Sequence, residues 1–284
     1  MEIRSVGVVG LGTMGAGIAQ VCVQAGIETV GREVSAELVE TARARIEHYL
    51  GRAIEKGRLS EEDKEAALAR LQTTTDLGDL ADCDLVVEAI VEELEAKQNL
   101  FRELDGIVGL EAVLATNTSA LSVTAIAGAT KHPERVVGMH FFNPAPVLSL
   151  VEVVRTDASS EKSVNAVHAF AERIGKRPIR CRDTPGFVVN RILIPLLNDC
   201  VRVLDEADVT PEDFDTALTA GLNWPIGPCA LIDLIGVDVH VHASEALHEA
   251  LGESRMAPPR LLVEMRDAGR LGRKSGQGFF SYET

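Results

Sequence analysis

The sequence predicts an α/β fold: a doubly wound, mainly parallel sheet with an inserted helix pair, followed by an all-helical C-terminal domain. Three observations lead to this prediction. Short, nearly all-apolar runs alternate with helical patterns through about residue 180, two helical patterns interrupt that alternation early, and strand-like runs vanish after Pro185. Short apolar strands separated by helices are typical of a parallel sheet covered on both faces. Sheets of this kind bind ligands at the carboxyl ends of their strands.

The expected strands are short segments rich in β-branched residues. They are residues 5–9, 27–32, 85–88, 112–116, 136–140, 150–155 and 178–181. The inserted helix pair follows the second strand and covers residues 37–56 and 61–71, with Gly57-Arg58-Leu59 between the two patterns. Ser60 is the expected N-cap of the second helix. We therefore expect two antiparallel helices that project from the sheet.

The character of the sequence changes at Pro185. From there, apolar residues recur at helical spacing through residues 187–204, 214–218, 231–247 and 261–265. Asp183-Thr184-Pro185 predicts the start of a helix, because a capping residue precedes a proline suited to the first helical turn. We therefore expect one domain over residues 1–182 and a second, helical domain over residues 183–284.

The composition excludes several classes of protein. The formal charge is −15 and 4% of the residues are aromatic, whereas nucleic acids and anionic membranes are bound by clustered Lys and Arg. The five cysteines are scattered without a Cys-x-x-Cys pair, and His240, His242 and His248 lack metal-ligand spacing. No apolar run is long enough to span a bilayer, and we expect no signal peptide. These features predict a cytoplasmic protein that binds neither a metal, nor nucleic acid, nor a membrane.

The motif Gly10-Leu11-Gly12-Thr13-Met14-Gly15 fits G-x-G-x-x-G directly after the first strand, and a helical pattern follows it. Gly10 would make the tight turn, Gly12 would let the backbone approach a pyrophosphate, and Gly15 would let the helix pack closely on the strand. The spacing arises by chance elsewhere, but its place between a strand and a helix predicts a Rossmann-like dinucleotide site.

The choice of dinucleotide depends on the end of the second strand. Glu33 lies where the ribose hydroxyls are expected, and its charge would repel a 2′-phosphate. This predicts NAD as the cofactor. Arg32 beside it could accept that phosphate instead, which leaves NADP as the alternative.

His140 ends a predicted strand, and Glu152 lies in the next one. A short connection would let the carboxylate reach the imidazole. Such a pair fixes the tautomer of the histidine and raises the basicity of its other ring nitrogen, as general acid–base catalysis near neutral pH requires. The spacing alone leaves a structural role for His140 open.

Several motifs in order resemble the 3-hydroxyacyl-CoA dehydrogenase family, and within it the bacterial 3-hydroxybutyryl-CoA dehydrogenases. They are Asn117-Thr118-Ser119, the segment from His140 to Pro146, Leu150-Val151-Glu152-Val153, the segment from Thr184 to Arg191, Gly227-Pro228, Leu231-Ile232-Asp233, and the segment from Gly272 to Phe279. The resemblance covers essentially the whole chain. It implies hydride transfer between NAD(H) and C3 of a (3S)-3-hydroxyacyl-CoA, with short chains such as 3-hydroxybutyryl-CoA favoured, and a homodimer formed through the helical domain.

The resemblance also implies a role for each matching residue. His140 would exchange a proton with the 3-hydroxyl, oriented by Glu152, while Ser119 and Asn190 would hydrogen-bond the reacting oxygens of the substrate. The residues matching NAD contacts, besides the glycine motif and Glu33, are Glu92, Lys97, Ser119, Asn143 and Lys274. Arg52 and Lys56 on the helix pair match basic residues that contact coenzyme A.

The chain departs from the family pattern at two positions. Ala120 replaces a second serine, which removes a hydroxyl near the site, and Glu33 replaces the commoner aspartate. Neither change removes the expected chemistry. Two other functions stay open on sequence alone: a dehydrogenase of a free hydroxy acid, which would not need Arg52 and Lys56, and a dinucleotide-binding protein without turnover. The acyl length and the physiological direction of the reaction are not determined by these residues.

Overall fold

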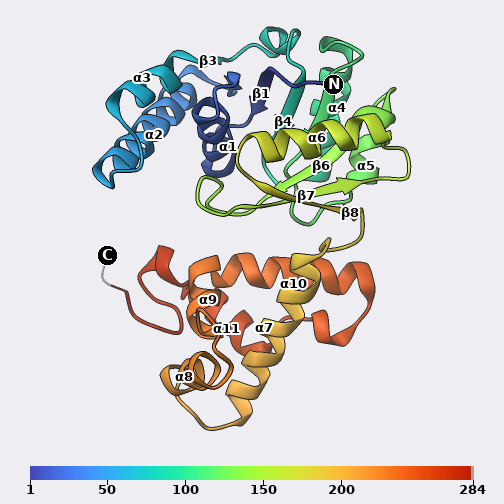
Figure 1. Cartoon of the computed structure of the whole chain (residues 1–284). Helices are drawn as coiled ribbons and strands as arrows, with labels where there is room; N and C mark the ends of the chain where they lie inside the picture. Colours follow the sequence, from blue (N-terminus) through green and yellow to red (C-terminus); the bar gives the residue numbers. More distant parts are fainter. Residues whose placement is uncertain (283–284) are drawn as a thin grey trace. The chain divides into compact units, whose positions relative to one another are not determined.

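The seven strands expected from the sequence are all present and lie in one sheet with an eighth, unexpected strand (Figure 1). The computed structural model describes residues 1–282. The order across the sheet is β3-β2-β1-β4-β5-β6-β7-β8. The strands are β1 (Ser5–Val9), β2 (Glu28–Arg32), β3 (Leu71–Thr74), β4 (Leu85–Glu88), β5 (Val113–Thr116), β6 (Val136–Phe141), β7 (Leu150–Arg155) and β8 (Arg177–Arg182).

Strand pairing is parallel throughout except between β6 and β7, which are antiparallel. The strands β1 and β4 are neighbours although β2 and β3 lie between them in sequence, so the order of the sheet reverses there. The carboxyl ends of β1 and β4 therefore flank the crevice in which doubly wound sheets bind their ligands.

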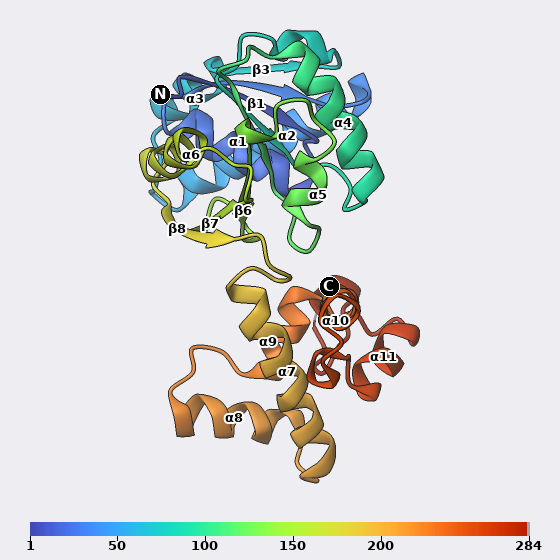
Figure 2. The same ribbon diagram turned by 90° about the vertical axis from the view of Figure 1, so that its right-hand side faces the viewer.

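Helices cover both faces of this sheet (Figures 1 and 2). One face carries α1 (Thr13–Gln24) and α6 (Glu161–Arg173), and the other carries α4 (Leu94–Ile107) and α5 (Val123–Ala127). The largest apolar cluster joins α1 and α6 to the sheet, and it includes fully buried Val8, Ile18 and Val153. Burying β-branched and leucine side chains on both faces stabilises the parallel arrangement that the apolar strands predict.

The inserted helices are α2 (Ala36–Glu55) and α3 (Glu61–Ala69), and the hydroxyl of Ser60 accepts the backbone N–H of Asp63, as expected of the N-cap. The predicted end of the second helix at residue 71 is wrong. Leu71 begins β3, the outermost strand beside β2. This strand is short and only Leu71 in it is fully buried, so its sequence lacks the apolar run that marks the other strands.

The chain divides into two compact units, Met1–Thr184 and Pro185–Thr284. The division lies two residues beyond the position expected from the sequence. The second unit contains α7 (Val189–Glu206), α8 (Pro211–Leu222), α9 (Pro228–Ile235), α10 (Val237–Leu251) and α11 (Arg260–Asp267). None of the helices within residues 1–282 is long and apolar enough to cross a membrane.

Two expectations about this second unit are wrong. The apolar pattern over residues 231–247 predicts one helix, but Gly236 separates α9 from α10 at a φ of 103°, which a helix cannot accommodate. Asp183 caps no helix of the second unit, because α7 begins at Val189. Its carboxylate instead accepts the backbone N–H groups of Val123 and Thr124 at the start of α5.

Candidate active site

The glycine motif has the geometry that a pyrophosphate site requires. Gly10 has a φ of +85°, and a Cβ there would lie 2.8 Å from the carbonyl oxygen of Ala89. A Cβ on Gly15 would overlap the carbonyl oxygen of Gly10, so only glycine lets α1 approach the strand this closely. A Cβ on Gly12 would meet no atom within 4 Å. Gly12 is the N-cap of α1 and supplies no side-chain cap to the N–H groups of the first turn, as expected of a helix N-terminus that binds an anion.

Glu33 follows β2 and contacts the glycine motif directly. Its carboxylate accepts the backbone N–H of Leu11 at 2.6 Å and that of Val34 at 3.0 Å. The acidic side chain thus lies beside the first glycine turn, where the ribose of a dinucleotide is expected. Arg32, the residue considered for a 2′-phosphate, donates from Nε to the carbonyl oxygen of Thr75.

His140 and Glu152 are brought together by the antiparallel pairing of β6 and β7. They are direct partners in the register, and Nδ1 of His140 lies 2.7 Å from Oε2 of Glu152. Both side chains are almost completely buried, His140 at 5% exposure and Glu152 at 0%. The ring of Phe142 packs beside the imidazole at 4.5 Å between ring centres. The carboxylate therefore holds Nδ1 and fixes the orientation of the imidazole ring.

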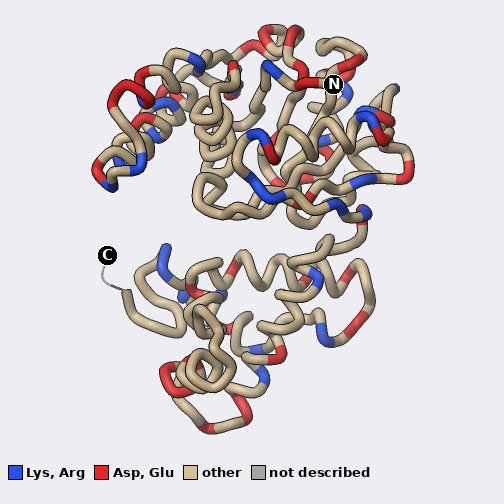
Figure 3. Tube along the Cα trace, viewed as in Figure 1, with Lys and Arg blue, Asp and Glu red and all other residues tan. Residues whose placement is uncertain are grey.

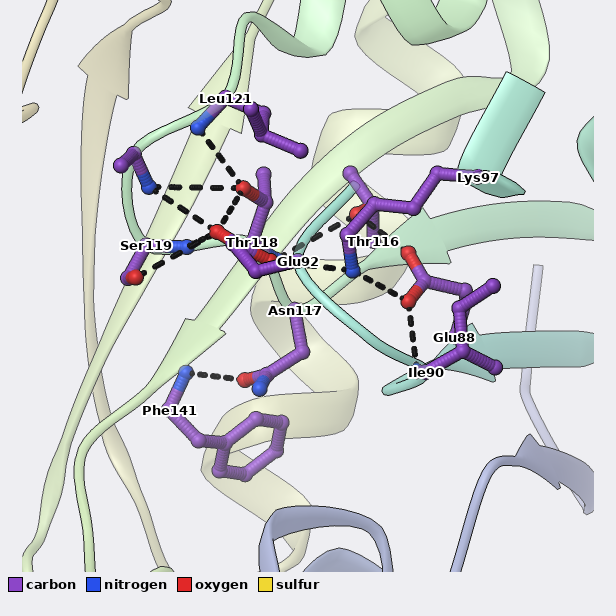
Figure 4. A network of polar contacts seen from close by, with 11 residues as sticks. Glu88, Ile90, Glu92, Lys97, Thr116, Asn117, Thr118, Ser119, Leu121 and Phe141 are labelled. Atoms are coloured by element: carbon purple, nitrogen blue, oxygen red, sulfur yellow. Dashed lines mark hydrogen bonds and ion pairs between the residues drawn. The ribbon is translucent and has the colours of Figure 1, made fainter. Parts of the chain in front are cut away.

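The loop after β5 carries Ser119, whose side chain is exposed (Figure 4). The loop is fixed to β6 by Asn117, because its Oδ1 accepts the backbone N–H of Phe141 at 2.9 Å. Phe141 is the residue after His140. The side chain of Asn117 thus links the segment with the candidate substrate-binding hydroxyl to the strand with the candidate proton carrier.

Glu92 and Lys97 belong to a polar network on the other side of the same loop (Figure 4). Lys97 is 1% exposed and its ammonium lies 2.5 Å from Oε1 of Glu88 and 3.2 Å from Oε2 of Glu92. Oε1 of Glu92 accepts the hydroxyl of Thr118 at 2.5 Å and the backbone N–H of Ser119 at 2.8 Å. Burial alone would raise the pKa of Glu92, but Lys97 and the hydrogen bonds from the loop hold that pKa below its ordinary value.

A cavity of about 370 Å³ lies beside the glycine motif, within the first unit. Its walls come from one side of α1, one side of α2 and the loop between β6 and β7. Arg52, Lys56 and Asn143 all line it, as does Thr13 of the glycine motif. Figure 3 shows basic and acidic residues interspersed along the α2–α3 pair. The two cations chosen from the sequence therefore share one cavity with residues of the predicted dinucleotide site.

The remaining candidates lie in the second unit. Asn190 occupies the first turn of α7, and it is partly buried. Lys274 is exposed, and its ammonium lies 2.6 Å from the carboxylate of Asp238. Ala120, the departure from the family pattern, donates its backbone N–H to Glu92 at 3.3 Å.

Three residues that the sequence analysis did not select shape the site. Asn117 fixes the Ser119 loop, Glu88 binds Lys97, and Lys176 anchors the loop between β6 and β7. The nearly buried Lys176 ammonium donates to the carbonyl oxygens of Ala145 and Leu148, and burial lowers its pKa. A lysine that is buried against carbonyl groups leaves no pattern in the sequence, whereas Asn117 could have been found because it lies inside a motif already recognised.

Comparisons with known proteins agree with this geometry. Residues 5–184 match the model of the 3-hydroxyacyl-CoA dehydrogenase NAD-binding domain, and residues 186–282 match that of the C-terminal domain of the same family. The chain is 46% identical to a probable 3-hydroxybutyryl-CoA dehydrogenase of Deinococcus radiodurans, covering 97% of this chain and 99% of that protein. An Escherichia coli 3-hydroxyadipyl-CoA dehydrogenase is 42% identical over this whole chain, which spans 60% of its length.

A solved structure gives the same result. The (S)-3-hydroxybutyryl-CoA dehydrogenase of Ralstonia eutropha has a TM-score of 0.95 and 42% identity, and each chain is covered completely by the other. Two family models that together span nearly the whole chain, and relatives above 40% identity over its full length, decide the assignment. The chain belongs to the 3-hydroxyacyl-CoA dehydrogenase family and carries its NAD-binding domain.

Proposed function

We propose that this protein interconverts a short-chain (3S)-3-hydroxyacyl-CoA, such as 3-hydroxybutyryl-CoA, and the corresponding 3-oxoacyl-CoA. The observation that carries the proposal is the buried His140–Glu152 pair, with 2.7 Å between Nδ1 and Oε2, on the strand that Asn117 joins to the Ser119 loop. A proton carrier and a hydrogen-bonding hydroxyl on adjoining segments suit the oxidation of a secondary alcohol.

In this proposal His140 removes the proton of the 3-hydroxyl at Nε2 and returns it in the reverse direction. Glu152 keeps the Nδ1 proton in place and stabilises the imidazolium form, because a buried cation needs a nearby negative charge. Ser119 and Asn190 hydrogen-bond the reacting oxygens and hold C3 in position. Bound NAD supplies the hydride acceptor for this step, or NADH the donor for its reverse.

The residues around the glycine motif fit NAD. The N-terminus of α1 offers backbone N–H groups to a pyrophosphate, and nothing crowds Gly12. The Glu33 carboxylate beside Leu11 suits ribose hydroxyls and repels a 2′-phosphate. Asn143, Lys274, Glu92 and Lys97 complete the predicted cofactor contacts, although Lys97 is too deeply buried to reach a ligand without rearrangement.

The cavity between α1 and α2 supports coenzyme A as the carrier of the acyl group. It is bordered by neutral residues near Gly17 and Ala145, and by Arg52 and Lys56 on α2. A pantetheine arm is neutral and the nucleotide end of coenzyme A bears phosphates, so this distribution of charge matches the molecule. A free hydroxy acid carries one carboxylate and would not need two cations here, whereas the several phosphates of coenzyme A would use both.

We further propose that two copies associate through α7 of the second unit. Its exposed apolar residues Ile192, Leu196 and Val203 lie on one side of the helix and are 66%, 38% and 51% exposed. An apolar stripe of this kind is costly in water and suits a self-complementary contact. Light scattering should show a dimer that Ile192→Glu dissociates, whereas Leu110→Glu, at an exposed apolar position of the first unit, leaves it intact.

The activity is tested by following the loss of NADH absorbance with acetoacetyl-CoA, in parallel with NADPH. Turnover that prefers NADH is the expected result. A preference for NADPH would contradict the role given to Glu33. Absence of turnover with acetoacetyl-CoA, together with turnover of a free 3-oxo acid, would contradict the coenzyme A assignment. A series of longer and dicarboxylic acyl groups then measures chain-length preference. Location in the cytoplasm stays a prediction from the sequence.

A further inference from the structure

Lys176 is a buried cation without an acidic partner. The residue is 9% exposed, and no carboxylate of residues 1–282 pairs with it. Its ammonium donates instead to the carbonyl oxygens of Ala145 at 2.5 Å and of Leu148 at 2.9 Å. Burial lowers the pKa of Lys176, because the charged form loses contact with water. A charge buried in this way is costly, so its presence needs a reason beyond packing.

The backbone at Lys176 is fixed on both sides. Its own N–H donates to the carbonyl oxygen of Ala171, near the end of α6, at 2.9 Å. The next N–H, that of Arg177, donates to the carbonyl oxygen of Ser149 at 2.7 Å. Arg177 begins β8, which pairs with β7. The ammonium therefore extends from a junction of the sheet and α6 that can hold a loop in place.

The segment that Lys176 holds is the loop between β6 and β7, residues 142–149. Within this loop two consecutive N–H groups, those of Val147 and Leu148, donate to the carbonyl oxygen of Pro144, both at 3.0 Å. The ammonium bonds two other carbonyl groups, one inside this turn and one at its end. Buried carbonyl groups need a donor, and Lys176 provides one for both. The lysine thus completes the hydrogen bonding of the loop.

The other side of the loop packs on α1. A Cβ at Gly17 would lie 3.1 Å from Cδ of Pro146 and 3.3 Å from Cβ of Ala145, so the loop approaches the helix closely. Residues 143–147 form one wall of the cavity of about 370 Å³, and residues of α2 form another. Lys176 does not line this cavity. It therefore acts on a ligand there only through the position of the loop.

We infer that Lys176 is a positioning residue for this cavity: it holds the loop between β6 and β7 at the distance from α2 that the carrier arm of a thioester requires. The inference rests on the proposed function, in which the cavity receives coenzyme A. It accounts for the buried charge, because proteins retain locally unfavourable features chiefly where function needs them. A loop that is fixed before the ligand arrives also avoids the free-energy cost of ordering it on binding.

The test is Lys176→Met, which introduces a side chain of similar length without a charge or an N–H donor. We expect KM for acetoacetyl-CoA to rise about tenfold and kcat to stay within about twofold of wild type, because binding then includes the ordering of the loop. The Kd for NADH from fluorescence should not change, since both hydrogen bonds lie beyond Asn143 in the loop. A fall in kcat as large as the rise in KM would place the effect at the reacting atoms and would overturn the inference.

Lys176→Gln is the conservative variant. Its side chain keeps two N–H donors without the charge, so it should raise KM less than Lys176→Met does. A larger rise in KM for Lys176→Gln would mean that the lost hydrogen bonds do not cause the effect, and would contradict the inference.

Acetoacetyl-pantetheine separates the effect of the loop from that of the cations, because it keeps the neutral arm and lacks the nucleotide phosphates. Lys176→Met should raise KM for this thioester by the same factor as KM for acetoacetyl-CoA. The effect on acetoacetyl-N-acetylcysteamine, which lacks most of the arm, should be smaller. A rise confined to acetoacetyl-CoA would assign the effect to the phosphate contacts of Arg52 and Lys56, and would overturn the inference.

Arg173→Met is the matched control. Arg173 lies on α6, three residues before Lys176, and its guanidinium also donates to a backbone carbonyl oxygen, that of Ile3, at 2.7 Å. Loss of this bond should lower the melting temperature and leave KM unchanged. A rise in KM equal to that of Lys176→Met would show that any lost contact between a cation and a carbonyl group impairs binding, which the inference does not allow.

Amide hydrogen exchange gives a measurement that needs no turnover. Lys176→Met should speed exchange at Val147 and Leu148, whose N–H groups form the turn of the loop, whereas Arg173→Met should not. Unchanged exchange at both amides contradicts the inference even if acetoacetyl-CoA is not the substrate. Faster exchange, together with a wild-type enzyme that does not turn over acetoacetyl-CoA, would support the hold of Lys176 on the loop and contradict the proposed function alone.

Discussion

The two ends of α4 carry two buried ionic clusters that use similar groups for different purposes. At the amino end Lys97 bridges Glu88 and Glu92, and at the carboxyl end Asp105 binds Arg135 at 2.7 Å. Each charge on α4 lies at the end where the helix dipole disfavours it, so each is placed for its tertiary contacts.

The difference between the clusters lies in where their hydrogen bonds end. Arg135 donates to the Asp105 carboxylate, to the carbonyl oxygen of Asp105 and to that of Gly109. All three bonds join Arg135 to the carboxyl end of α4 and the residues just after it. The Lys97 cluster continues through Glu92 to the loop of exposed Ser119. The Asp105–Arg135 cluster lies near the amino ends of the strands. The Lys97 cluster lies at their carboxyl ends. Burial and pairing are therefore common to both clusters, and they differ in that the Lys97 cluster reaches an exposed residue at the edge where doubly wound sheets bind ligands.

The largest expected effect is at the carboxyl ends of the strands. His140→Ala should lower kcat by roughly 10²–10⁴-fold, the usual contribution of general acid–base catalysis, with NADH binding nearly intact. Steady-state kinetics and a fluorescence titration measure the two quantities. Wild-type activity in this variant would refute the role of His140. It would also remove the main reason to place function at the carboxyl ends of the strands.

At the amino ends of the strands the effect should appear in stability instead. Arg135→Met removes the guanidinium from the buried Asp105 carboxylate and leaves it only the contacts with Lys131 and His132, which costs about 3–5 kcal/mol of unfolding free energy. Urea denaturation measures this loss, and kcat of the folded enzyme should not change. Arg102→Met, at an exposed position of the same helix, is the control and should change stability by less than about 0.5 kcal/mol. A drop in kcat with Arg135→Met would erase the distinction between the two clusters.

The stability of the helical unit should depend on pH in a different range from that of the Asp105 cluster. Burial lowers the pKa of His240 to about 4, so between pH 6.5 and 4 the unfolded chain binds more protons there than the folded chain. Stability is therefore lost as pH falls, by about 2 kcal/mol between pH 7 and pH 5. The Asp105 pKa is lowered, because Arg135 and its other partners offset burial, so its contribution is lost only below its ordinary value of 3.8.

Denaturation curves at pH 7 and 5 test this separation. His240→Gln should remove most of the loss over that range, while His242→Gln, at an exposed neighbour, should not. An equal pH response in wild type and His240→Gln would assign the acid sensitivity to other groups.

The smallest expected effect concerns the cavity lined by α2. Replacing Arg52 and Lys56 together by Gln should raise KM for acetoacetyl-CoA about threefold to tenfold, since exposed charge pairs contribute less than about 1 kcal/mol each. KM for acetoacetyl-N-acetylcysteamine, which lacks the phosphates, should stay the same. Arg45→Gln, on α2 but outside the cavity, is the control. Equal changes with both thioesters would argue against a phosphate contact.

Much of the fold could be predicted because its signals are local. An apolar strand, the glycine motif and the cap at Ser60 each occupy a few consecutive residues, and each was predicted in its observed place. Features that depend on partners far away in the sequence were not predicted. Asp183 lies two residues before a proline, as the cap of a following helix would, yet its carboxylate caps α5, about sixty residues earlier in the chain.

The candidate site shows the same limit. The sequence predicts that Glu152 reaches His140, because one short connection joins their strands, and the structure confirms the contact. It does not reveal that Lys97 is buried, since a lysine near the start of an amphipathic helix is normally solvated. The break at Gly236 was missed for a related reason: apolar residues continue at helical spacing on both sides of it.

The pairing of β6 and β7 fixes the contact between His140 and Glu152, whereas the loop that joins the two strands is not part of that contact. His140 faces Glu152 only in the observed pairing, and a slip by one residue would turn one of them to the other side of the sheet. The loop between the strands is held at its base by Lys176, and its residues 143–147 line the cavity. Substitutions within that loop would therefore alter the lining of the cavity without moving the His140–Glu152 contact, which the pairing of the two strands fixes separately.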